Sequence, residues 1–167
     1  VKQIHESDIF GTFIEIGAGN PVSYQLMEVE GASATVYEAL SPYNKQAQLD
    51  TFFGGYAEKI IPRSVSKEFV NLLVEQHTAN LQAGDNLPDE HNTFYVSSFQ
   101  IGNDICSHGW IGYKYKETYR LYHLTLPKWL ASKRTQAISE LGRVGMEIIL
   151  NKNEDKSIPH CDILIDG

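Results

Sequence analysis

The chain has 167 residues, of which 42% are hydrophobic and 21% charged, as expected for one domain with a full core. Its net charge of −7 at pH 7 argues against broad nucleic-acid binding, which needs a basic face, but allows one small phosphorylated ligand. No apolar run reaches the roughly 20 residues of a membrane span, residues 1–10 do not resemble a signal peptide, and two cysteines are too few for a disulfide framework.

The first part of the chain is predicted to alternate between strand and helix. Apolar, β-branched residues over 10–16 indicate a strand, and the glycine turn at 17–21 leads into a helix that continues over 23–29. Residues 33–39 fit either a short helix or a strand. After the break at Ser41-Pro42, a helix is expected over 43–53 because two glycines follow it.

The middle of the chain is predicted to be an amphipathic helix followed by an exposed loop. The helix covers 64–81, with Ser66 as its N-cap and with Phe69, Val70, Leu73 and His77 on one face. The polar residues 82–92 predict the loop.

From residue 93 the hydrophobic period changes to two. This pattern predicts strands over 94–101, 109–115 and 119–126, the last two joined as a hairpin. A long helix over 128–151 follows, and 162–165 is expected to add an edge strand. The element order predicts a single α/β domain over residues 1–167, a three-layer α/β/α sandwich with a mixed sheet.

The sharpest local feature is the segment Glu15-Ile16-Gly17-Ala18-Gly19-Asn20-Pro21. Glycines between a strand and a helix let the backbone approach a ligand, and free N–H groups there favour an anion. The same turn can also do no more than connect two elements. Glu15 can orient a ribose hydroxyl of a ligand or cap the turn, and both readings stay open.

The order of motifs from Glu15 to Gly54 resembles the opening of the CinA C-terminal domain, the nicotinamide-nucleotide amidase family. That family has a Glu-Ser-x-Thr-Gly-Gly turn, then Val-Pro-Gly-Ser/Ala-Ser, then Tyr-Ser-Asn-x-x-Lys. The corresponding segments here are 15–20, 29–33 and 43–48. Ser98 stands where the family has a loop threonine, and Arg134 matches an arginine that opens the last helix. The likeness covers residues 12–150 and implies a CinA-like fold.

The resemblance implies hydrolysis of the carboxamide of nicotinamide mononucleotide by a serine nucleophile, with a Lys base helped by a Tyr. The nucleophile position holds Ile16, however, and the Lys position holds Gln48. Tyr43 remains, and Ser98 is a conservative stand-in. Neighbouring groups offer a substitute, with Ser23 or Ser41 as nucleophile and Lys45 as base.

We therefore expect a catalytically degenerate, cytoplasmic CinA-like protein that binds a small anionic or nucleotide-like ligand such as a pyridine nucleotide. The expected ligand-binding residues are Glu15, Gly17, Ala18, Gly19, Asn20, Tyr43, Ser98 and Arg134. The weak catalytic candidates are Tyr43, Ser98 and Lys45.

Two alternatives stay open. The first is an active deamidase with a relocated nucleophile. The second is a homo-oligomeric interaction module that uses the last helix or the tyrosines Tyr113, Tyr115, Tyr119 and Tyr122 as its surface. The family resemblance suggests a homodimer. No cofactor, metal, membrane or nucleic-acid partner is expected. His108 beside Cys106, and His91 beside two acids, are read as structural or solvated residues, because no second ligand cluster exists at a suitable spacing.

Overall fold

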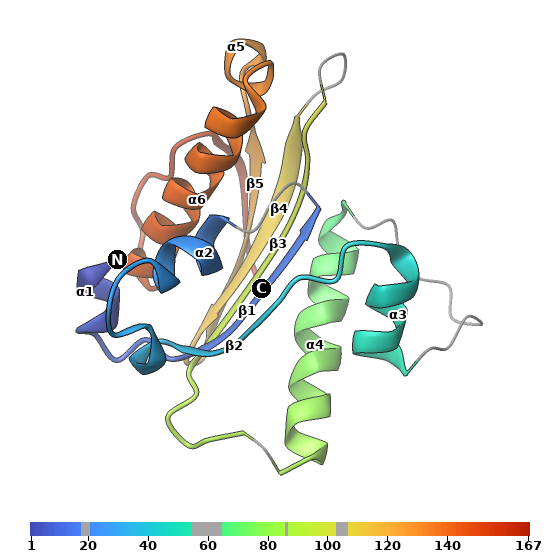
Figure 1. The fold of residues 1–167 in the computed structure, drawn as a ribbon, viewed down its shortest axis with the longest axis vertical. Helices are drawn as coiled ribbons and strands as arrows, with labels where there is room; N and C mark the ends of the chain where they lie inside the picture. Colours follow the sequence, from blue (N-terminus) through green and yellow to red (C-terminus); the bar gives the residue numbers. More distant parts are fainter. Residues whose placement is uncertain (18–20, 55–64, 86, 103–106) are drawn as a thin grey trace.

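The computed structural model describes residues 1–17, 21–54, 65–85, 87–102 and 107–167. One mixed sheet with strand order β2-β1-β3-β4-β5-β6 forms the middle layer, and helices cover both of its faces (Figure 1). The predicted α/β class with a mixed sheet is confirmed. The strands are β1 (Gly11–Gly17), β2 (Val36–Leu40), β3 (Thr93–Gln100), β4 (His108–Tyr115), β5 (Thr118–Thr125) and β6 (Cys161–Asp166).

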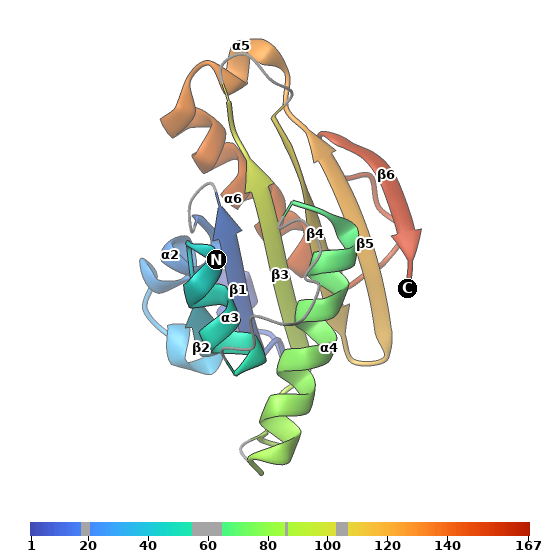
Figure 2. The same cartoon turned by 90° about the vertical axis from the view of Figure 1, so that its right-hand side faces the viewer.

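The helices divide between the two faces of the sheet. One face carries α1 (Lys2–His5), α2 (Pro21–Met27), α5 (Lys128–Ala131) and α6 (Arg134–Asn151). The other carries α3 (Lys45–Phe53) and α4 (Lys67–Ala83), and Figure 2 shows α4 lying across the strands on that side. Among the described residues, no helix is both long and apolar enough to cross a membrane.

The sheet combines parallel and antiparallel pairing. Strand β1 lies between β2 and β3 and is parallel to both, whereas β3, β4, β5 and β6 pair antiparallel in that order. The carboxyl ends of β1, β2 and β3 therefore meet at one edge of the sheet. Open α/β sheets bind their ligands outside this edge, so we expect a ligand site there.

Capping residues set the observed helix boundaries. The Asn44 side chain accepts a hydrogen bond from the Ala47 amide at 2.8 Å, so α3 begins at Lys45 rather than at Tyr43. Ser66 caps α4 as predicted, accepting from the Phe69 amide at 3.1 Å. The helix expected over 128–151 is two helices, because the chain leaves helical geometry at Ser132 and Lys133.

The ambiguous segment 33–39 contains both kinds of structure. A single 3₁₀ turn, η1 (Ala32–Ala34), precedes β2. The residue before the turn, Gly31, has φ of 100°, a conformation that glycine adopts without the steric cost of a side chain. The element order therefore gains one strand over the predicted order, and this strand forms one edge of the sheet.

The prediction that the tyrosines of β4 and β5 form an exposed surface is wrong. Tyr113, Tyr115 and Tyr122 belong to the core cluster beneath α6, and Tyr113 is fully buried. Tyr119 is partly buried on the opposite face, where its hydroxyl donates to Asn71 Oδ1 at 2.6 Å. These side chains hold the helices on the sheet. The expected homodimer stays a prediction.

Candidate functional site

The structure brings most of the predicted site residues to the carboxyl edge of the parallel strands. Gly17 ends β1, Ser98 lies two residues before the end of β3, and Tyr43 follows β2. Arg134, at the start of α6, donates from Nη1 to the carbonyl of Ile101, just beyond β3, at 3.4 Å. The predicted ligand-binding residues Ala18, Gly19 and Asn20 lie outside the described residues.

The side chains at this edge do not form one cluster, because they point to two faces of the sheet. Phe13 and Tyr95 pack toward α2 and α6, and the alternation of strand residues places Glu15 on that same face. Ile16 packs with the α3 and α4 residues, and Ser98, its partner in the β1–β3 register, lies on that second face. Sequence spacing predicted that these residues lie at one edge of the sheet, but it did not predict that their side chains point to two faces.

Gly17 meets a packing requirement of the backbone. Its φ is 90°, and a Cβ atom at this position would lie 2.2 Å from the carbonyl oxygen of Phe99. Glycine is therefore needed for β1 to approach β3 so closely at this point. The glycine turn begins with a packing requirement, and this accounts for its first residue without a ligand.

Glu15 caps the start of α2 from inside the protein. Its Oε1 accepts from the amides of Val22 at 3.0 Å and Ser23 at 3.4 Å, and the side chain is only 1% exposed. Burial raises the pKa of Glu15 from 4.5 to about 7, although hydrogen bonds from Val22 and Ser23 act to lower it. Among the described residues Oε2 has no hydrogen-bond partner. The capping interpretation of Glu15 is thus observed directly.

Ile16 and Gln48, at the positions that the resemblance assigns to the nucleophile and the base, both have structural roles. Ile16 is 3% exposed and lies in the apolar cluster between the sheet, α3 and α4. Gln48 is 6% exposed, and its Nε2 donates to the carbonyl of Tyr43 at 3.0 Å, which ties the loop to the helix. Tyr43 and Lys45 are exposed.

A hollow of about 240 Å³ lies beside the carboxyl end of β2. Ser23, Tyr24 and Met27 of α2 form one wall, and the residues 39–41 form the other. The amide of Ser23 is one of the two that hydrogen-bond to Glu15. The hollow therefore joins two of the serines expected as substitute nucleophiles, Ser23 and Ser41, to a buried carboxyl group. Spacing alone could not pair them, because 18 positions separate the two serines.

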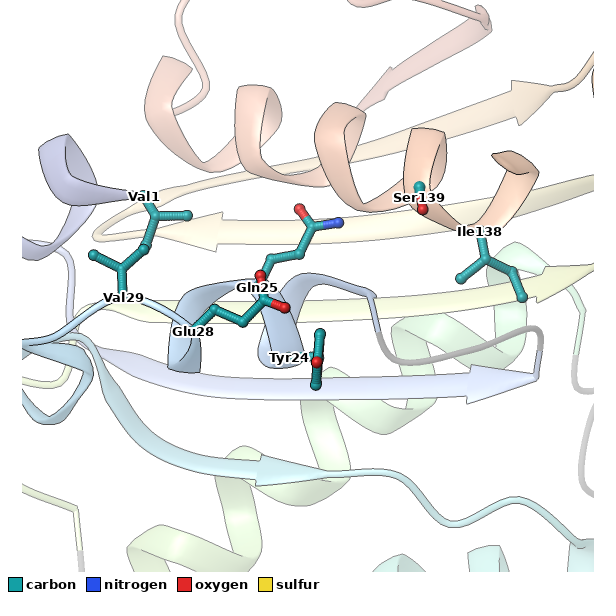
Figure 3. A pocket seen from close by; sticks show the side chains of 7 residues that line it. All are labelled: Val1, Tyr24, Gln25, Glu28, Val29, Ile138 and Ser139. Atoms are coloured by element: carbon teal, nitrogen blue, oxygen red, sulfur yellow. The ribbon is translucent and has the colours of Figure 1, made fainter. Parts of the chain in front are cut away.

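A larger hollow of about 590 Å³ lies on the outer side of α2, between that helix and α6. Figure 3 shows Gln25 and Tyr24 of α2 facing Ser139 and Ile138 of α6 across it. The only charged side chain in its lining is acidic Glu28. No strand end contributes to it, so it is a poorer candidate for an anionic ligand than the smaller hollow.

A second polar cluster joins α4 to strands β1 and β2. His77 Nε2 contacts Glu38 Oε1 at 2.6 Å, and the Thr12 hydroxyl donates to the same oxygen at 3.1 Å. His91 Nε2 lies 2.9 Å from the Thr12 hydroxyl. The hydrogen bond from His77 holds the pKa of Glu38 below its ordinary value, against partial burial, which acts to raise it. Sequence reasoning placed His77 in the core but missed its partner.

Replacing Glu38 by glutamine is expected to lower the free energy of unfolding at neutral pH by about 1–3 kcal/mol, because a charge-assisted bond to buried His77 is lost. A carboxyl group with a lowered pKa stabilises the fold above its unfolded pKa of 4.5 and loses that effect as the pH falls through the folded value. Urea unfolding between pH 3 and 7 should show a smaller acid loss in Glu38→Gln than in the parent. The exposed Glu90→Gln should match the parent. If Glu38→Gln lost as much free energy of unfolding at acid pH as the parent, the lowered pKa of Glu38 would be contradicted.

No protein-family model matches the chain, and no curated protein matches it either. Several solved structures do. Competence damage-inducible protein A (ComA) from Klebsiella pneumoniae is 11% identical with a TM-score of 0.65, over 89% of this chain and 88% of that chain. The competence/damage inducible protein CihA from Agrobacterium tumefaciens is 15% identical with a TM-score of 0.64, over 92% and 90%.

A protein of the competence-damaged (CinA) superfamily from Escherichia coli matches less closely, with 9% identity and a TM-score of 0.54 over 87% of this chain and 84% of that chain. At such low identity these likenesses define the fold alone. The chain thus has a CinA-like α/β fold, as the resemblance implied.

Proposed function

We propose that this protein binds a small nucleotide-like molecule at the carboxyl edge of its parallel strands and does not carry out the amidase reaction of CinA-like enzymes. The observation that carries the proposal is the structural role of Ile16 and Gln48, which stand at the positions that the resemblance assigns to the nucleophile and the base. Ile16 fills the core, and Gln48 holds the loop after β2. Neither side chain provides a nucleophile or a base there.

The hollow beside β2 supports the binding part of the proposal. Its volume of about 240 Å³ is below the roughly 300–1,000 Å³ of sites for drug-sized ligands, so it suits a nucleoside-sized group rather than a dinucleotide. Ser23 and Ser41 offer hydroxyl groups, and Met27 offers apolar surface. The chain runs from Ser41 directly into Tyr43 and Lys45, an exposed aromatic ring and an exposed cation that suit a base and a phosphate.

Thermal-shift titration and calorimetry with nicotinamide mononucleotide, adenosine monophosphate and their nucleosides test the binding. We expect stabilisation by at least one of them and loss of the effect in Ser41→Trp, which fills the hollow. The matched control is Ser139→Trp, which places the same side chain in the larger hollow between α2 and α6. Binding that resists Ser41→Trp, or no binding at millimolar concentration, would refute the proposed site.

An ammonia-release assay on nicotinamide mononucleotide tests the loss of the amidase reaction. We expect no release above the uncatalysed rate. Turnover would instead favour the second candidate function, a deamidase with Ser23 as nucleophile. The observation that favours it is the place of Ser23 beside Glu15, to which its amide donates at 3.4 Å, because the Glu15 pKa of about 7 suits a general base.

In that second mechanism, Ser23 Oγ would attack the amide carbon while its proton passes to Glu15. Ammonia would then leave, and water would release the acid from the acyl-enzyme. Ser23→Ala should abolish such turnover while Ser139→Ala retains it. Equal rates in the two variants would exclude Ser23 as the nucleophile.

A further inference from the structure

Three polar side chains form a chain on the strands farthest from β1. His108 Nδ1 lies 3.1 Å from His123 Nε2, and His123 Nδ1 lies 2.6 Å from Asp162 Oδ1. The second oxygen of Asp162 accepts from the Thr125 hydroxyl at 2.8 Å. The strands that carry the three residues, β4, β5 and β6, lie side by side at one edge of the sheet (Figure 2).

Asp162 contacts the Nδ1 side of the His123 ring. In the tautomer whose Nδ1–H donates to the Asp162 carboxylate, Nε2 of His123 presents its lone pair toward His108. A carboxylate on the far nitrogen is the arrangement that most metal-binding histidines show, because it orients the ring and raises its basicity.

The spacing of the two imidazole nitrogens also suits a metal ion. Zinc binds histidine nitrogen at about 2.0–2.1 Å, so one ion beside the line joining two nitrogens 3.1 Å apart can reach both. The Trp110 ring lies 4.8 Å from the His123 ring and shields one side of the pair. The Asp162 side chain is half exposed, so solvent reaches the other side.

The histidine pair lies on the face of the sheet that also carries Ile16 and Ser98. Ser98 is opposite Trp110 in the β3–β4 register, and Trp110 is opposite His123 in the β4–β5 register. Two strand spacings, about 10 Å, therefore separate the backbone of Ser98 from that of His123. The pair lies beyond the start of α4, because α4 packs at Gly112, two residues farther along β4.

We propose that His108 and His123 bind one late first-row divalent cation such as Zn²⁺ or Ni²⁺, with Asp162 as the carboxylate that orients His123. Imidazole nitrogens select these ions over Mg²⁺, which prefers oxygen ligands. Among the described residues no group of three or more His, Cys, Asp or Glu side chains is placed to hold a metal. Within the described part of the chain, His108 and His123 are thus the two side chains proposed to bind the ion.

Calorimetry of the chelator-treated protein with Zn²⁺, Ni²⁺ and Mg²⁺ tests the proposal. We expect one equivalent of Zn²⁺ or Ni²⁺ to bind, no Mg²⁺ to bind, and the affinity to fall at acid pH, where the histidines are protonated. His108→Gln and His123→Gln should each abolish this binding, and Asp162→Asn should weaken it about 10–100-fold.

The matched control is His160→Gln, because His160 also contacts a carboxylate, Glu140 Oε1 at 3.2 Å, but faces no second histidine. This variant should bind Zn²⁺ as the parent does. Thermal unfolding of each metal-free variant checks that the sheet is intact. Absence of binding at millimolar Zn²⁺, or binding that persists in both His108→Gln and His123→Gln, would leave the pair as a plain N–H···N hydrogen bond and overturn the proposal.

Discussion

Replacing Glu15 by glutamine is expected to stabilise the folded chain by about 3 kcal/mol at pH 8 and to change its stability little near pH 4. The carboxyl group is 1% exposed, and its charged form loses hydration in the fold. Glutamine keeps an oxygen that can accept from the amides of Val22 and Ser23, and it carries no charge. The cost of burying a carboxylate should therefore disappear while the cap of α2 remains.

The sign follows from the raised pKa of Glu15. Its folded pKa of about 7 lies above the ordinary value of 4.5, so between these values the folded state binds more protons than the unfolded state. Stability must then fall as the pH rises from 4.5 to 7, and Glu15→Gln must remove that fall. This dependence has the opposite direction to that of Glu38.

Urea unfolding of Glu15→Gln and the parent from pH 4 to pH 8 measures the effect. The exposed Glu28→Gln, one residue beyond the end of α2, is the control and should follow the parent across the range. Parallel curves for Glu15→Gln and the parent would show that Glu15 is ionised and well compensated in the fold. In that case the pKa of Glu15 would not be raised in the folded protein.

Replacing Ile16 by serine, the residue that CinA-like amidases have at the corresponding position, is expected to cost about 2–5 kcal/mol of stability, the range for truncating buried isoleucine. Ile16 packs among residues such as Ile14, Phe52 and Phe69. The substitution leaves a cavity and places a hydroxyl in an apolar cluster. We also expect no ammonia release, because Gln48 still stands where the resemblance places the base.

Thermal and urea unfolding of Ile16→Ser measure the cost, and Ile163→Ser is the matched control. Ile163 lies on the edge strand β6 and is 46% exposed, so its change should be well under that of Ile16. An Ile16→Ser protein that is as stable as the parent would mean that this strand end is open to solvent. In that case the position of Ile16 would be available to a ligand.

Local signals in the sequence predicted most of the elements. Ser66 could be recognised as a cap, and the period of two after residue 93 gave three strands within one or two residues of their bounds. Asn44 shifted the start of α3 because its side chain satisfies an amide that Tyr43 cannot. The strand β2 stayed ambiguous because its five residues are too few to show a period.

The burial of each sheet face and the contacts between residues far apart in the sequence could not be predicted in the same way. Alternation showed that Tyr113 and Tyr115 share a face of β4, but only the packing of α6, later in the chain, shows that this face is buried. Glu38 and His77 are 39 positions apart, as are His123 and Asp162. Polar clusters made by such contacts leave no spacing signal, so the site could be predicted only as far as the strand edge.

The position of β1 between β2 and β3 has a consequence for the order of folding. Strands β3, β4 and β5 follow one another closely in the chain, so their pairing closes short loops. Pairing β1 with β3 instead joins Gly11 to Thr93, and closing a loop of that length costs more chain entropy before any contact repays it. We therefore expect the antiparallel strands β3, β4 and β5 to pair first, and the strand that carries Glu15, Ile16 and Gly17 to join them later.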